Sequence, residues 1–180
     1  KMAKNIMANR CGLDLRIYAY VADGTIADEA TPLATIDYAN EVSIELTSDM
    51  VWATGGQEHG KIVGFNNPIE GTLKISTQMV SMELLTLISG GDISKASTKV
   101  SFKNSNSAPT FYIIKGETMW VGEDGKVYTE TVTAFKACAK RNYNVTYSGD
   151  GDPQSLDVEF ELGSNTENLV LDVERETSAQ

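Results

Sequence analysis

The chain is poor in the residue types that most often carry out catalysis or bind metals. Its 180 residues include one histidine, His59, and two cysteines, Cys11 and Cys138. A single histidine excludes a multi-histidine metal site, and His59 lies in a glycine-rich segment without the signature of a Cys–His pair. The two distant cysteines could pair, but in a chain without a secretory pattern such cysteines are more often free thiols. We therefore expect no enzyme activity, no cofactor and no metal.

Long apolar runs and an excess of basic residues are also missing. No run approaches the roughly 20 residues of a membrane span, and residues 1–12 are basic without an apolar core, so we expect neither a span nor a secretory signal there. Lysine and arginine number 15 against 25 acidic residues, which gives a net charge of −10. This balance argues against tight binding to nucleic acid, which needs clustered cations. It favours solubility, or a surface past which another polyanion moves without adhering.

What the sequence does contain is the two-residue alternation typical of β-strands. We expect strands at residues 13–20, 35–46, 61–65, 71–77, 98–102, 111–121, 126–140, 156–162 and 168–173. The sequence Gly-Glu-Asp-Gly at 122–125 predicts a hairpin turn, because an Asp-Gly pair tolerates positive φ. The pattern predicts a single, mainly β domain over residues 1–180. Its fold would be an antiparallel sandwich or barrel with one inserted helix, with about 12 N-terminal residues and residues 174–180 extended or frayed.

The one expected helix, residues 79–88, is apolar on almost every side. A helix that covers a sheet normally keeps a polar face, but here only Ser81, Glu83 and Thr86 interrupt the apolar side chains. We expect Ser76 or Thr77 to cap its start and Gly90 or Gly91 to end it. Because one small chain readily covers only one side of a helix, the sequence predicts a subunit interface. The residues assigned to it are Met79, Met82, Leu84, Leu85 and Ile88.

A second candidate interaction segment is the expected loop at residues 47–60, which is longer than an ordinary hairpin connection. Long loops in compact domains are usually functional or disordered. Trp52 lies at its centre and is either a core residue on a loop that folds back or an aromatic anchor for a partner. The residues assigned to this contact are Met50, Val51, Trp52, Gly55, Gly56 and His59.

Two acidic patterns have both an ordinary and a functional interpretation. The turns at 122–125 and 149–152 could hold a calcium ion loosely, but neither has the acidic spacing of an EF-hand, and turn formation explains both. On the strand at 156–162, Asp157, Glu159 and Glu161 alternate with apolar residues, and Glu45 occupies a similar place on its own strand. These carboxylates form either a solvated outer face or a wall that faces a channel carrying a polyanion.

Taken in order, several segments resemble the major tail protein of long-tailed bacteriophages, the subunit of the tail tube. The resemblance covers roughly residues 33–162. Its motifs are Val63-Gly64-Phe65, residues 68–73, the helical segment 78–89, Gly90-Gly91, the turn at 149–153 and the strand at 156–162. Tube proteins of contractile injection systems share this architecture.

This resemblance implies a structural virion protein that self-assembles. The expected assembly is a stack of hexameric rings that forms a hollow tube, with sheets of neighbouring subunits joined around a lumen through which DNA passes during ejection without specific binding. The segment at 47–60 would reach the adjacent ring. Further partners would be tape-measure, terminator, baseplate or sheath proteins. The expected location is the virion tail, assembled in the bacterial cytoplasm.

A protein of another class remains as the alternative. A carbohydrate-binding or adhesive β-sandwich could use Trp52, Trp120 and Tyr128 as a stacking platform. That interpretation explains the strands and the aromatic residues, but it does not explain why the helix is apolar on nearly all sides.

Overall fold

The computed structural model describes residues 7–9, 12–26, 31–36, 39–55, 60–78, 80–91, 98–103, 108–145 and 155–176. In chain order the elements are β1 (Met7–Asn9), β2 (Asp14–Ala19), β3 (Ala34–Ile36), β4 (Ala39–Thr47), β5 (Met50–Gly55), β6 (Gly60–Asn66), β7 (Glu70–Thr77), α1 (Met82–Ile88), β8 (Phe111–Gly122), β9 (Val127–Ala139), β10 (Leu156–Gly163) and β11 (Leu171–Arg175). The mainly β, antiparallel fold with one inserted helix is confirmed. No helix in the described ranges is long and apolar enough to cross a membrane.

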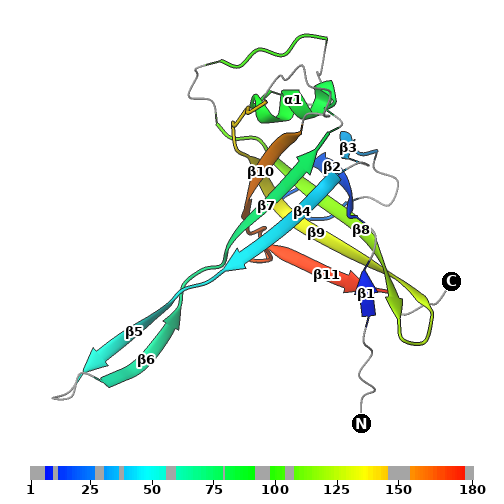
Figure 1. Ribbon diagram of the computed structural model, residues 1–180. Helices are drawn as coiled ribbons and strands as arrows, with labels where there is room; N and C mark the ends of the chain where they lie inside the picture. Colours follow the sequence, from blue (N-terminus) through cyan, green and yellow to red (C-terminus); the bar gives the residue numbers. More distant parts are fainter. Residues whose placement is uncertain are drawn as a thin grey trace.

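The strands form one large antiparallel sheet that curls around a core. The order is β3-β2-β8-β9-β10-β7-β4, with β1 added beside β8 and β11 beside β9. The long strands β8 and β9 change partners along their length: β8 pairs first with β2 and then with β1, while β9 pairs first with β11 and then with β10. In Figure 1, β4, β7 and β10 pass across β8 and β9 as a second layer.

Strict alternation places the core residues of β10 and β7 on one side of the sheet. Leu156, Val158, Phe160 and Leu162 are all buried, as the sequence predicts. Their cross-strand partners on β7 include Leu73 and Ile75, which are also buried. Because the side-chain period of a strand is two, the residues between them must face outward. The core and the acidic outer face are thus two sides of the same pattern.

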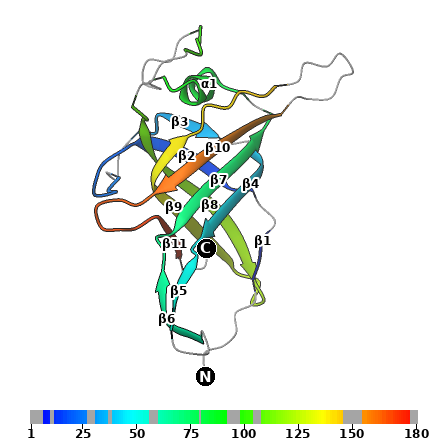
Figure 2. The same cartoon turned by 90° about the vertical axis from the view of Figure 1, so that its left-hand side faces the viewer.

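The helix α1 closes one end of this core, as Figures 1 and 2 both show. Ser81 caps its start, since the Leu84 backbone N–H donates to Ser81 Oγ at 3.1 Å. Gly90 ends it in the left-handed region, with φ at 76°. The predicted caps at Ser76 and Thr77 are wrong because both residues belong to β7 and pair with β10. The helix consequently begins at Met82, three residues later than predicted.

The other differences from the predicted elements lie mostly where strands leave the core. The predicted strand at 35–46 is split into β3 and β4, and Leu46 is exposed where β4 runs past the core. The described residues around 98–102 form no strand. The turn at 122–125 is confirmed: Gly125 has a φ of 74°, and its N–H donates to the Gly122 carbonyl at 2.9 Å. Cys11 and the turn at 149–152 lie outside the described residues.

The burial of α1 leads to a stability prediction. Leu84 is only 1% exposed within its own chain, so Leu84→Ala should lower the free energy of unfolding of the monomeric subunit by about 2–5 kcal/mol. Val80 precedes the helix and is exposed, so Val80→Ala should change it by about 0.5 kcal/mol or less. Urea unfolding of the two variants measures both values. Equal, small changes would contradict the placement of α1 in the core.

Candidate assembly surfaces

The strands β5 and β6 form a separate two-stranded sheet that projects from the body. Its two strands continue β4 and β7 at the end of the molecule away from α1 (Figure 1). We call this hairpin, residues 50–55 and 60–66, the arm. The backbone N–H of Asn67 donates to the Asp49 carbonyl at 2.8 Å, and Ser48 Oγ donates to the Asn67 carbonyl at 2.8 Å. These bonds tie the arm to the body at its base.

One face of the arm is organised around Trp52. Trp52 pairs across the ladder with Gly64, and a Cβ atom on Gly64 would come within 3.2 Å of both the Trp52 ring and Met50 Sδ. The glycine thus leaves room for the indole to lie across the neighbouring strand. Lys61 Nζ lies 5.4 Å from the centre of the Trp52 ring, within cation–π range. We call Met50, Trp52 and Lys61 the Trp52 face.

The opposite face of the arm is entirely apolar at the paired positions. Val51 pairs with Phe65 and Ala53 with Val63. Phe65 is 59% exposed and Val51 and Val63 are exposed as well. An isolated two-stranded hairpin is marginally stable in water, and exposed apolar clusters mark interaction sites. Within the part of the chain that the structure describes, both faces of the arm therefore expose large apolar side chains.

The predicted contact residues of segment 47–60 are exposed where the structure describes them, their role in a contact stays a prediction, and the predicted loop conformation is wrong. Met50, Val51, Trp52 and Gly55 belong to strand β5 rather than to a loop, because the alternation that continues β4 is hidden by polar residues at 47–49. Trp52 is 40% exposed, so it is not a core residue. Gly56 and His59 lie outside the described residues. Val63 and Phe65 were not assigned to this surface, although a hairpin interpretation pairs them with it.

The helix is a poorer candidate for a subunit interface than its sequence indicates. Leu84 and Ile88, both predicted interface residues, are buried in the core of their own chain, so their assignment is wrong. Met82 and Leu85 are half-buried, and Met79 lies outside the described residues. The physical reason is that α1 fills the open end of a curled sheet, which surrounds a helix more completely than a flat sheet does.

The outer face of β4, β7 and β10 is a polar surface in three rows across the strands. The register aligns Glu45, Thr72 and Glu161 in one row, Ser43, Lys74 and Glu159 in the next, and Glu41, Ser76 and Asp157 in the third. The structure therefore brings together all four predicted acidic residues, Glu45, Asp157, Glu159 and Glu161. It adds Glu41, which the sequence analysis did not assign although it alternates in phase with Ser43 and Glu45 on β4.

Two lysines, Lys74 and Lys140, partly neutralise this face. Lys140 Nζ lies 2.6 Å from Glu159 Oε1 and 3.4 Å from Glu161 Oε1. The hydrogen bond from Lys140, followed by its charge and that of Lys74, lowers the pKa of Glu159 below its ordinary value. The same hydrogen bond raises the pKa of Lys140. The face remains predominantly acidic: Glu41, Glu45, Asp157 and Glu161 are exposed, and Glu159 is half-buried.

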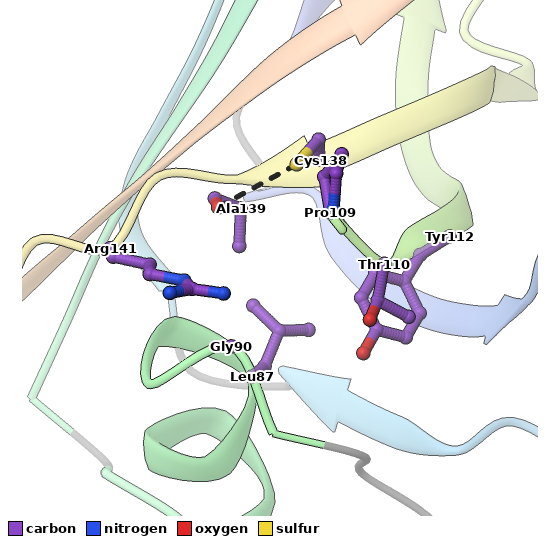
Figure 3. A pocket seen from close by; sticks show the side chains of 8 residues that line it. All are labelled: Leu87, Gly90, Pro109, Thr110, Tyr112, Cys138, Ala139 and Arg141. Atoms are coloured by element: carbon purple, nitrogen blue, oxygen red, sulfur yellow. Dashed lines mark hydrogen bonds between the residues drawn. The ribbon is translucent and has the colours of Figure 1, made fainter. Parts of the chain in front are cut away.

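Two hollows accompany these surfaces. A shallow groove of about 420 Å³ runs over the third row, beside Glu41, Lys74 and Asp157. A smaller pocket of about 130 Å³ lies between the end of α1 and the ends of β8 and β9 (Figure 3). It contains Cys138, a free thiol whose pKa is raised by burial and by the nearby Glu161 carboxylate. A thiol kept protonated in this way is a weak nucleophile.

The remaining chemical candidates do not converge on one place. Among the residues that the structure describes, no group of three His, Cys, Asp or Glu side chains could hold a metal ion. Asp124 stabilises the hairpin turn in which it lies. Its carboxylate accepts from the Lys126 N–H at 3.1 Å and from Tyr128 Oη at 2.8 Å, and these bonds lower its pKa.

The three aromatic residues proposed as a carbohydrate platform are separated. Trp120 and Tyr128 are cross-strand partners on β8 and β9, whereas Trp52 lies on the arm. Tyr128 is buried, and Trp120 Nε1 is buried without a hydrogen-bond partner. The Arg175 guanidinium lies 5.0 Å from the centre of the Trp120 ring. A sugar therefore has no shared stacking surface on these three residues.

Comparison with known protein families finds no family that matches this chain, and a search of curated proteins finds no match.

The Lys140 bridge predicts how acid affects stability. Because the pKa of Glu159 is lowered in the folded state, its contribution is present above the ordinary value of 4.5 and is lost as the pH falls through the folded pKa. Glu159→Gln should therefore lower Tm at neutral pH, and the difference from the wild type should shrink in acid. Asp157→Asn is the matched control, since it removes a carboxylate of the same face and leaves the bridge intact. A difference in Tm that persists in acid would contradict this assignment.

Proposed function

We propose that this chain is a structural subunit of a bacteriophage-type tail tube, which self-assembles into stacked hexameric rings around a lumen that conducts DNA. The observation that carries the proposal is the arm, a projecting hairpin with large apolar side chains exposed on both faces. Covering these side chains would contribute roughly 25 cal/mol per Å² of apolar area removed from water. In a self-assembling subunit, the partner that covers these side chains is a second copy of the same chain.

The acidic outer face supports the second half of the proposal, the conduit. Its carboxylates lie on β4 and β10, on either side of β7, so they would line a wall if these sheets surrounded a lumen. An acidic wall retains water and cations between itself and DNA, and this keeps a polyanion mobile. Tape-measure, terminator, baseplate or sheath proteins are the further partners that such a tube implies, in a virion tail.

The proposal does not depend on α1. The helix is largely covered by its own chain, so the exposed arm, and not the helix, is the feature that supports self-assembly. A carbohydrate-binding module is supported less well, because its three aromatic residues are separated in the structure.

The assembly proposal predicts different outcomes for two phenylalanines with similar exposure. Phe65→Ser, on the arm, should abolish ring and tube formation because it removes the largest side chain of one apolar face. Phe102→Ser, in an exposed segment outside the arm, should leave assembly intact. Negative-stain microscopy and sedimentation measure assembly, and circular dichroism checks that both variants fold. Normal tubes from folded Phe65→Ser, or a wild type that remains monomeric at every concentration, would contradict the proposal.

The conduit proposal predicts that the subunit does not bind DNA. A wall rich in lysine would exchange counterions for phosphates, and its affinity would rise steeply at low salt. We expect no complex in a gel-shift experiment at low ionic strength, and none with Lys140→Ala. A variant with Glu45→Lys, Asp157→Lys and Glu161→Lys should bind DNA with an affinity that falls as salt is added. A salt-dependent complex with the wild type would contradict an acidic conduit.

A further inference from the structure

A second exposed apolar patch lies at the tip of the β8–β9 hairpin. Met119 is 50% exposed, Val121 is 46% exposed and Val127 is also exposed. Val121 pairs directly with Val127, and Met119 pairs with Thr129 one step along the same face. Trp120 and Tyr128 point to the other face, as the burial of Tyr128 shows. We call Met119, Val121 and Val127 the tip patch.

The tip patch lies at the end of an outer face that otherwise carries charged residues and threonines. Toward the body, the same face of β8 presents Lys115 and Glu117, and Glu117 lies 3.4 Å from Arg16 Nη1. The row next to Met119 and Thr129 aligns Glu117, Thr131 and Glu174 across three strands. The patch is therefore bordered by carboxylates on its body side. With respect to the residues that the structure describes, the three side chains of the patch stay exposed to solvent.

The Trp52 face of the arm matches the tip patch in chemistry. It offers two large apolar side chains, Met50 and Trp52, and Lys61 is the only charged residue in the described part of the arm. Apolar residues would meet apolar residues, and the lysine would approach the carboxylates at the border. Tryptophan is among the residues most often found at the energetic centre of protein interfaces.

The geometry prevents the contact within one copy and allows it between copies. The arm and the β8–β9 tip project on opposite sides of the body, both at the end away from α1 (Figure 1), and the rotated view agrees (Figure 2). A contact between unlike surfaces on opposite sides of one chain is heterologous. Repeated from copy to copy, such contacts close into a ring or continue as a filament.

We propose that the Trp52 face of one copy packs on the tip patch of the next copy in the same ring. This inference rests on the proposed function, and it assigns the arm to contacts within a ring rather than to the stacking of one ring on the next. Stacking through the arm would instead require it to reach the α1 end of another copy, since α1 lies at the opposite end of the body.

Cross-linking between single-cysteine copies distinguishes these arrangements. In a background of Cys11→Ser and Cys138→Ser, one copy carries Met50→Cys on the Trp52 face or Val63→Cys on the opposite face of the arm. The other copy carries Val121→Cys on the tip patch or Val80→Cys near α1. Each pair is mixed, assembled and oxidised, and the disulfide-linked dimers are measured on a non-reducing gel. We expect the Met50→Cys and Val121→Cys pair to cross-link at least severalfold more than any other pair.

Each other result would overturn a defined part of the inference. Preferential cross-linking of Met50→Cys to Val80→Cys would assign the arm to stacking, and preferential cross-linking of Val63→Cys to Val121→Cys would assign the other arm face. Rings without a cross-link to Val121→Cys would remove the tip patch while leaving the proposed function standing. Monomers alone, with the wild type also monomeric, would overturn both proposals.

Discussion

The pairing of β8 with β9 is the constraint on which the rest of the structure depends. These two long strands share a ladder from Phe111 and Cys138 to Val121 and Val127, closed by a turn in which Gly125 takes a positive φ. Each strand is long enough to serve two partners in succession, and the sheet must curl to accommodate them. The core, the open end filled by α1, and the exposed tip all follow from that length.

The sequence predicts the fold well wherever a strand has one solvent-exposed face and one buried face. Residues 156–162 and 71–77 alternate without interruption, and the structure places their apolar residues in the core. The turn at 122–125 is equally clear because its glycine is needed for a backbone conformation that few residues tolerate.

The sequence is less informative where burial does not alternate. The first strand of the arm, β5, is exposed on both faces, so it has no periodic pattern of burial and is predicted as a loop, whereas the second strand, β6, is predicted at 61–65. The prediction for the helix fails for the opposite reason. The helix is apolar on nearly all sides, and no sequence rule states how many of those sides a curled sheet will cover. Leu84 and Ile88 were therefore assigned to a neighbour although their own chain buries them. The local sequence pattern indicates whether a residue is exposed or buried, but only the fold shows which part of the protein covers it.

The way the arm joins the body also determines how it carries a load. Its strands are direct extensions of β4 and β7, and the bonds between Asp49, Ser48 and Asn67 keep the two strands together across the junction. A pull on the arm therefore acts along β4 and β7, parallel to the strands and perpendicular to their hydrogen bonds. From β7 the force passes into β10 through the seven paired positions from Gly71–Leu162 to Thr77–Leu156. Those bonds are loaded together in shear rather than opened one at a time, so the arm can transmit tension to two strands whose inner side chains are buried in the core.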